Sequence, residues 1–333
     1  MDFMYKRKQQ LNIQSVADKL KGGPAPLNIP ELVVNGPALL DQNVRKFHRG
    51  DFMAIVGSSG IGKTSFIMWL YKHILLNNPE GICVIVACEM SQSQLINKWF
   101  KATKDCPEIS DRLYIVTSYN DDGTTNDLSI KGIKKRLLEF KSGLDTNILS
   151  FICDHLHIIK REEGETLDDV AYGFSNMCKD VNSLGILTAQ TTKGKSGEGD
   201  MPLDKNSVFG TSIVTWECAY MITLCQPLKT LGLKKFPVTS WQLAKNRFKE
   251  EEDNIVESVN YLLKFDYNDE SYCKLNGQEL TDFKGYFGEV LELRKEKEKT
   301  GEVMFDTSYT IKTPKGNEVK IPEQYGSETK RWD

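Results

Sequence analysis

A run of glycine, serine, lysine and threonine is the stretch of this sequence best suited to bind a phosphorylated ligand. It reads Gly57-Ser58-Ser59-Gly60-Ile61-Gly62-Lys63-Thr64 and fits the pattern G-x-x-x-x-G-K-[ST]. In such a loop the backbone N–H groups surround the phosphates, the lysine neutralises the outer phosphates and the hydroxyl binds Mg²⁺. These residues and Ser65 are therefore predicted to bind ATP, or another nucleoside triphosphate, together with Mg²⁺.

The flanking residues predict the two elements that must hold this loop. An apolar run at 52–56 precedes the loop and predicts a strand. Apolar residues at helical spacing follow over 65–76, and Asn77-Asn78-Pro79 ends that run. The order strand, loop, helix places the phosphates at a helix N-terminus, where free N–H groups and the helix dipole favour an anion. An ordinary Gly-Ser loop, which is the alternative, does not require this context.

Seven apolar runs predict the strands of one sheet. Most are continuous rather than alternating, as in strands buried on both faces, and helical stretches separate several of them. We therefore expect an α/β fold with a mostly parallel central sheet flanked by helices. In such a sheet, ligands collect at the carboxyl ends of the strands. The runs are 52–56, 82–87, 113–116, 148–152, 185–188, 219–224 and, more weakly, 238–244.

Polar side chains follow three of these runs. Glu89, Asp154 and Gln190 come directly after apolar stretches, so all three would converge near the phosphate loop. Phosphoryl transfer needs positioning and charge compensation. We expect Asp154 and Thr64 to hold Mg²⁺, Glu89 to orient the attacking water, and Gln190 to bind the γ-phosphate. A polar residue that ends a strand by chance is the alternative at each position.

A loop rich in Gly, Lys and Ser begins three residues after the last of these strand ends. Its cations and amides suit contacts to a phosphodiester backbone. Lysines that only meet solvent are the alternative. Its place beside the predicted γ-phosphate contact favours a nucleic-acid interpretation. The residues that we expect to bind DNA are Lys193, Lys195, Lys205 and Asn206.

A second group of cations lies on a predicted strand at 241–247. Side chains two apart share a face of a strand, so Lys245 and Arg247 would project together and Asn246 away from them. Such a pair can reach a phosphate bound by another subunit, as an arginine finger does. Ordinary surface charge at a strand end is the alternative.

Composition narrows the class of protein. The chain has 333 residues, a formal net charge of -3 and a pI near 6.0, which argues against coating nucleic acid through overall positive charge. No run approaches ~18 consecutive apolar residues, so we expect a cytoplasmic protein with no membrane partner. Eight cysteines without a C-x-x-C pair predict reduced thiols. Two histidines beside one acid, at Asp154, His155 and His157, are a weak metal signal that we set aside.

Three parts of the chain are expected. Residues 1–35 form a polar linker or subunit-docking segment, in which Ile13, Val16 and Leu20 share one face of a short helix. A frayed tail is the alternative there. Residues 36–285 form the ATPase core. Residues 286–333 form a polar tail, in which either a small hairpin or no order is expected near 309–321.

Taken together, these motifs resemble the DnaB-like replicative helicases of superfamily 4, which have a RecA-like P-loop core. The resemblance covers about residues 36–267. Each motif is short, and their common order is specific. The motifs are Leu39-Leu40-Asp41, Arg49-Gly50-Asp51, the phosphate loop, Glu89-Met90-Ser91, Asp154-His155-Leu156, Gln190 and Ala244-Lys245-Asn246-Arg247. Residues 210–220 follow the family pattern only loosely.

The resemblance implies a homo-hexameric ring that hydrolyses nucleoside triphosphate between subunits and moves along single-stranded DNA. In the family the residue at Glu89 is the catalytic base, and those at Lys245 and Arg247 act across the subunit boundary. The sequence has no room before the core for a collar or primase domain, which suggests a minimal phage-like member in an infected bacterial host. A primase or a helicase loader is a further expected partner. A RecA-like recombination filament and a RecA-type ATPase acting on proteins are the alternatives.

Overall fold

The structure is a computed structural model whose contacts divide the chain into two units, Met1–Glu31 and Leu32–Asp333. Almost all described residues belong to the second unit. The predicted helix face at Ile13, Val16 and Leu20 lies outside the described residues. Those described are 31–33, 46–87, 90–118, 125–191, 208, 210–225, 238–247, 260–282, 308–312 and 318–322.

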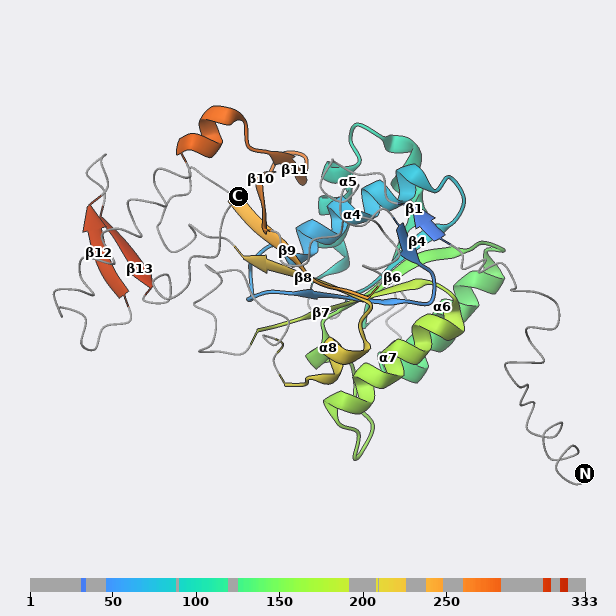
Figure 1. The fold of residues 1–333 in the computed structure, drawn as a ribbon. Helices are drawn as coiled ribbons and strands as arrows, with labels where there is room; N and C mark the ends of the chain where they lie inside the picture. The colour runs from blue at the N-terminus through green and yellow to red at the C-terminus, as the bar shows by residue number, and fades with distance from the viewer. Residues whose placement is uncertain are drawn as a thin grey trace, which may run out of the picture. The chain divides into compact units, whose positions relative to one another are not determined.

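A nine-stranded sheet forms the centre of the second unit, in the order β11-β10-β9-β8-β3-β7-β6-β4-β5 (Figure 1). The strands from β8 to β5 are parallel, whereas β9, β10 and β11 are antiparallel. Each predicted strand is present, and the mostly parallel sheet is confirmed. The bounds are β3 Phe52–Val56, β4 Ile82–Ala87, β5 Leu113–Val116, β6 Ile148–Asp154, β7 Leu184–Ala189, β8 Tyr220–Cys225, β9 Val238–Asn246, β10 Asn260–Asp266 and β11 Ser271–Lys274.

Helices cover both faces of this sheet (Figure 1). On one face lie α4 (Lys63–Asn77) and α5 (Gln92–Ala102), and on the other lie α6 (Ile130–Gly143), α7 (Leu167–Val181) and α8 (Ile213–Glu217). Strand β3 shows why both faces are apolar, because Met53 and Ile55 pack into one core and Phe52, Ala54 and Val56 into the other. Its continuous apolar run follows from this double burial.

Shorter elements complete the described chain. The 3₁₀ helices are η1 (Pro107–Arg112) and η2 (Leu156–Ile158), and β1 (Glu31–Val33) pairs with β2 (Lys46–His48). Strands β12 (Ser308–Lys312) and β13 (Glu318–Pro322) form an antiparallel hairpin, the first of the two alternatives for that part of the tail.

The described cysteines have free thiols, and all except Cys273 are buried. Burial raises the pKa of the Cys83 and Cys178 thiols, which keeps them protonated. Among the described residues, none of the helices is long and apolar enough to cross a membrane.

Candidate functional site: a nucleotide pocket and a distant pair of cations

The phosphate loop joins β3 to α4 and depends on its glycines. A Cβ atom on Gly57 would lie 2.9 Å from Ile61 Cγ2 and 3.0 Å from the Leu224 carbonyl oxygen, so a side chain does not fit there. Gly60 has φ 69 and Gly62 has φ 99, in the left-handed region that favours glycine. The close approach and the two turns place the backbone of the loop around the start of α4.

Lys63 lies folded over this loop. Its Nζ donates hydrogen bonds to the carbonyl oxygens of Gly57, at 2.8 Å, and Ser58, at 2.9 Å. These bonds hold the ammonium group above the loop, where the pattern predicts the outer phosphates. The lysine therefore has the position that its predicted role requires.

Asp154 and Thr64 lie together, as predicted for a magnesium site. Thr64 Oγ1 donates to Asp154 Oδ2 at 3.4 Å, and the Asp154 side chain is almost completely buried. The other carboxylate oxygen, Oδ1, accepts a 2.6 Å hydrogen bond from Thr188 Oγ1 on β7. A carboxylate and a hydroxyl beside a phosphate loop are oxygen ligands suited to Mg²⁺. Thr188 was not predicted, because its only signal in the sequence is a polar residue inside an apolar run.

Gln190 also reaches this region. Its side chain lines the nucleotide pocket, and its Nε2 lies 3.5 Å from His155 Nε2. His155 is buried beside Asp154, next to the magnesium site as expected. Glu89 lies outside the described residues, whereas its neighbour Met90 lines the pocket.

A cavity of about 500 Å³ lies over the loop. Its walls come from the loop, the ends of β6 and β7, helix α5 and the β10–β11 hairpin. The first three walls follow from the sequence motifs, whereas the contributions of α5 and the hairpin were not predicted. The unpredicted residues that line the cavity are Gln94, Lys98, Phe265, Tyr267 and Tyr272.

Lys98 connects these unpredicted walls to the phosphate helix. Its Nζ lies 3.0 Å from Ser65 Oγ on α4 and 3.1 and 3.0 Å from the two carboxylate oxygens of Glu270. The Glu270 side chain is only 5% exposed, so its charge needs this partner. A lysine on an amphipathic helix looks like ordinary surface charge in the sequence, which is why this contact was not expected.

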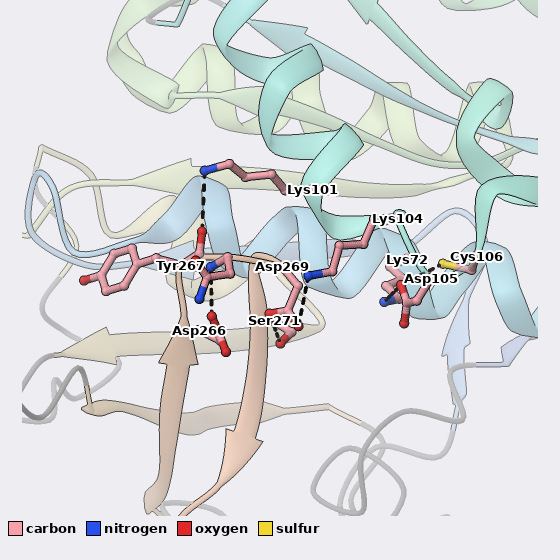
Figure 2. Close-up of polar contacts among 10 residues, drawn as sticks. Lys72, Lys101, Lys104, Asp105, Cys106, Asp266, Tyr267, Asp269 and Ser271 are labelled. Atoms are coloured by element: carbon pink, nitrogen blue, oxygen red, sulfur yellow. Dashed lines mark hydrogen bonds and ion pairs between the residues drawn. The ribbon is translucent and has the colours of Figure 1, made fainter.

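Two more lysines of α5 and the residues after it fasten the turn between β10 and β11 (Figure 2). Lys101 Nζ donates to the Tyr267 carbonyl oxygen at 3.5 Å, and Lys104 Nζ lies 3.9 Å from Asp269 Oδ2. Tyr267 lines the cavity while 62% of its surface is exposed. The turn therefore offers an aromatic face to a ligand in the pocket.

Lys245 and Arg247 lie at the other edge of the sheet. Asn246 pairs with Tyr220, and Tyr220 pairs with Met53 at the start of β3, whereas the phosphate loop follows the end of β3 at Val56. At ~3.3 Å per residue, the two ends of β3 are about 10 Å apart. The two side chains project together and Asn246 is buried, as predicted. They are directed away from the phosphate loop of their own chain.

The predicted DNA-binding residues Lys193, Lys195, Lys205 and Asn206 lie outside the described residues. The segment that contains them is bounded by an antiparallel bridge between Thr191 and Val208. This bridge starts directly after Gln190. The described part of the loop therefore begins beside the predicted γ-phosphate contact.

Comparison with known proteins agrees with these motifs. Residues 33–112 match the family model of the DnaB-like helicase C terminal domain. The fold is similar to that of a DnaB-like replicative helicase, described with its interactions with primase, at a TM-score of 0.61 and 13% identity, over 83% of this chain and 72% of that chain. It is also similar to a second solved structure, an isolated ATPase domain, at a TM-score of 0.58 and 11% identity, over 81% of this chain and 98% of that chain.

A search of curated proteins found no match. The family match covers the phosphate loop and the segment after it, while the structural similarity extends over most of the chain. The expected resemblance to the DnaB-like helicases and the expected RecA-like fold are both confirmed. The chain thus has a segment of the DnaB-like helicase C-terminal domain, set in the fold of a DnaB-like helicase ATPase domain.

Proposed function

We propose that this chain is an ATP-dependent replicative DNA helicase, a hexameric ring that hydrolyses Mg²⁺-bound nucleoside triphosphate between its subunits and translocates on single-stranded DNA. One observation carries the proposal. The phosphate loop and the Lys245–Arg247 pair lie at opposite edges of one sheet, so that a complete site needs two copies of the chain. This arrangement explains why neither half is sufficient for hydrolysis.

The first half binds the nucleotide. Lys63 exchanges its bonds to the loop carbonyls for phosphate oxygens, and Thr64 and Asp154 hold Mg²⁺, which neutralises charge on the phosphates. Lys98 adds a further cation at the wall of the cavity. Tyr267 and its aromatic neighbours pack against the base. Stacking of this kind tolerates different bases, so we expect weak discrimination among nucleoside triphosphates.

The second half comes from the neighbouring copy. Lys245 and Arg247 of that copy compensate the charge that develops on the phosphates during transfer, as an arginine finger does. Glu89 orients the attacking water. Gln190 contacts the γ-phosphate, and the loss of that phosphate after hydrolysis changes the bridge between Thr191 and Val208 that follows Gln190 in the chain.

The proposed DNA contacts are Lys193, Lys195, Lys205 and Asn206. Basic groups that line a ring channel would let a chain with a net charge of -3 bind DNA. We retain residues 36–285 as the core, 1–35 as the segment that docks on a neighbour, and 286–333 as the tail. A primase is the first partner to test, because the similar replicative helicase was described together with one.

A forked DNA substrate tests the proposal. With ATP and Mg²⁺, the wild-type chain should separate the strands, Lys63→Ala should not, and particle images should show closed rings. Filaments without unwinding would instead indicate a recombination-type protein. Hydrolysis that DNA does not stimulate would indicate an ATPase that acts on other proteins.

A further inference from the structure

The C-terminal turn of α8 holds both cations of the second half-site. Lys245 Nζ donates to the carbonyl oxygens of Thr215, at 2.6 Å, and Trp216, at 3.1 Å. Arg247 Nη2 lies 3.0 Å from the carbonyl oxygens of Trp216 and Glu217. Carbonyl groups at the end of a helix favour cations. The two side chains are therefore held in one place by backbone atoms.

The guanidinium group of Arg247 is held by one nitrogen. Its hydrogen bonds within the described residues all involve Nη2, including a longer one of 3.4 Å to the Cys218 carbonyl oxygen. Nη1 and Nε therefore remain for another acceptor. Arginine presents its donors in a rigid planar fork, so a phosphate can bind one edge while carbonyl oxygens hold the other.

The turn itself is fixed to the rest of the chain. Val214 is completely buried in the core beneath α8. Ser175 Oγ on α7 donates a 3.0 Å hydrogen bond to Glu217 Oε2, and Ser175 is only 5% exposed. This bond holds the last residue of α8 against α7. The carbonyl groups that hold the cations are therefore preorganised.

Trp216 presents a large apolar side chain at the same turn. The residue is 68% exposed, although its carbonyl oxygen accepts hydrogen bonds from both cations. An exposed tryptophan is unusual on a free surface and typical of the energetic centre of a protein contact. Any group that receives Arg247 must also come within a few ångströms of this residue.

We propose that the C-terminal turn of α8 is the contact surface for a second copy of this chain, with Trp216 packed against the rim of that copy's nucleotide pocket. The α8 carbonyl groups, fixed by Ser175 and Glu217, position Lys245 and Arg247 toward its phosphates. This inference rests on the proposed function and extends it to the residues that seat the two half-sites.

Charge and position identify the second copy as the occupant. Lys245 and Arg247 complement a pocket suited to an anionic triphosphate, and that pocket lies at the opposite edge of the same chain. Each copy therefore carries both complementary surfaces. Because the two surfaces differ, the contact is head-to-tail and repeats from copy to copy, which is the arrangement that produces rings or filaments.

A mixing experiment tests the contact. Arg247→Ala supplies the pocket and Lys63→Ala supplies the cations, so their mixture should recover hydrolysis that neither shows alone. Adding Trp216→Ala to the Lys63→Ala copy should lower the recovered rate at least about tenfold, the effect of losing an interface anchor. Trp216→Phe in that copy should retain most of the rate.

Matched variants separate contact from positioning. Ser175→Ala in the Lys63→Ala copy should lower the recovered rate several-fold without changing the size of the assembly, because it loosens α8 without altering the exposed surface. Leu138→Ala in that copy, an exposed apolar residue on α6, should leave the rate unchanged. An unchanged rate with both Trp216→Ala and Ser175→Ala would overturn the inference.

Fluorescence gives a second measurement. Among the described tryptophans, Trp69, Trp99 and Trp241 are buried, so iodide should mainly quench the emission that Trp216→Phe removes. That quenching should fall when Mg²⁺ and a non-hydrolysable ATP analogue drive assembly. Unchanged quenching in assembled protein would contradict the contact. If the mixture recovers no hydrolysis at all, the proposed trans site fails, which is a different outcome from recovery that ignores Trp216.

Discussion

Lys63 and Arg247 lie at opposite edges of the same sheet. Lys63 begins α4 after the carboxyl end of β3, whereas Arg247 follows β9 and donates its backbone N–H to the carbonyl oxygen of Ala219, before β8 begins. Two side chains that both suit a triphosphate are therefore directed to different places by one chain. Substitutions at each edge, and in the walls of the pocket between them, should have separable effects.

Lys63→Ala should abolish measurable hydrolysis and weaken nucleotide binding at least about 100-fold, because no other loop side chain neutralises the outer phosphates. Binding of a fluorescent ATP analogue and phosphate release measure the two effects. Lys131→Ala is the matched control, since Lys131 is an exposed lysine paired with Glu162 on the surface. Near-normal nucleotide binding by Lys63→Ala would contradict the assigned role.

Arg247→Ala should lower kcat about 1000-fold, within the range known for arginine fingers, while nucleotide affinity changes little. The reason is that Arg247 lies away from the pocket of its own chain. Separate measurements of nucleotide Kd and kcat distinguish these effects. Normal turnover by this variant would show that the residue does not act in trans.

Thr188→Val should raise the Mg²⁺ concentration needed for half-maximal hydrolysis at least about tenfold, the usual effect of losing a group that orients a metal ligand. The substitution removes the 2.6 Å hydrogen bond to Asp154 Oδ1 and keeps the side-chain shape. A Mg²⁺ titration at saturating nucleotide measures the change. Thr103→Val is a control for loss of a buried hydroxyl, because Thr103 bonds to the Trp99 carbonyl oxygen instead. Equal shifts in both variants would refute the assignment.

Lys98→Met should lower the free energy of unfolding by about 2 kcal/mol or more, because it leaves the buried Glu270 carboxylate without a partner. The double variant Lys98→Met, Glu270→Gln should lose less than the sum of the two single variants. Urea unfolding measures these values. The exposed pair of Lys131 and Glu162 provides the contrast, where Lys131→Met should cost less than about 0.5 kcal/mol.

Stability should fall in mild acid because of His73. Burial, with a smaller effect of Lys72, lowers the pKa of His73 to about 4, below its ordinary value of 6.5, while Asp105 opposes this shift. A proton then binds the unfolded chain more readily than the folded one. Stability is complete above pH 6.5 and falls as the pH drops toward 4, by up to about 3 kcal/mol from this group.

Urea unfolding at pH 7, 6 and 5 tests this dependence. The variant His73→Leu should lose less stability than the wild type between these pH values, because it removes the group that takes up the proton. Both proteins share the remaining titrating carboxylates, so the difference between their slopes reports on His73. Parallel slopes would rule out the assigned pKa.

The phosphate loop and the parallel strands could be predicted from the sequence. Both depend on neighbours along the chain: the glycines and Lys63 act within one loop, and a strand such as β3, buried on both faces, has a continuous apolar run. The order of the strands also placed Asp154 and Gln190 correctly, because carboxyl ends of parallel strands meet at one edge.

The meeting of distant residues could be found only in the folded chain. Lys98 and Glu270 are separated by 172 positions, and their pairing depends on how α5 packs against the β10–β11 hairpin, which no local pattern encodes. Thr188 orients Asp154 because β6 and β7 are neighbours in the sheet. The antiparallel direction of β9 sends Arg247 to the edge away from Lys63, where the carbonyl groups of α8 hold it. A spacing along the chain specifies local geometry, whereas the partner of a long side chain is set by packing across the whole sheet.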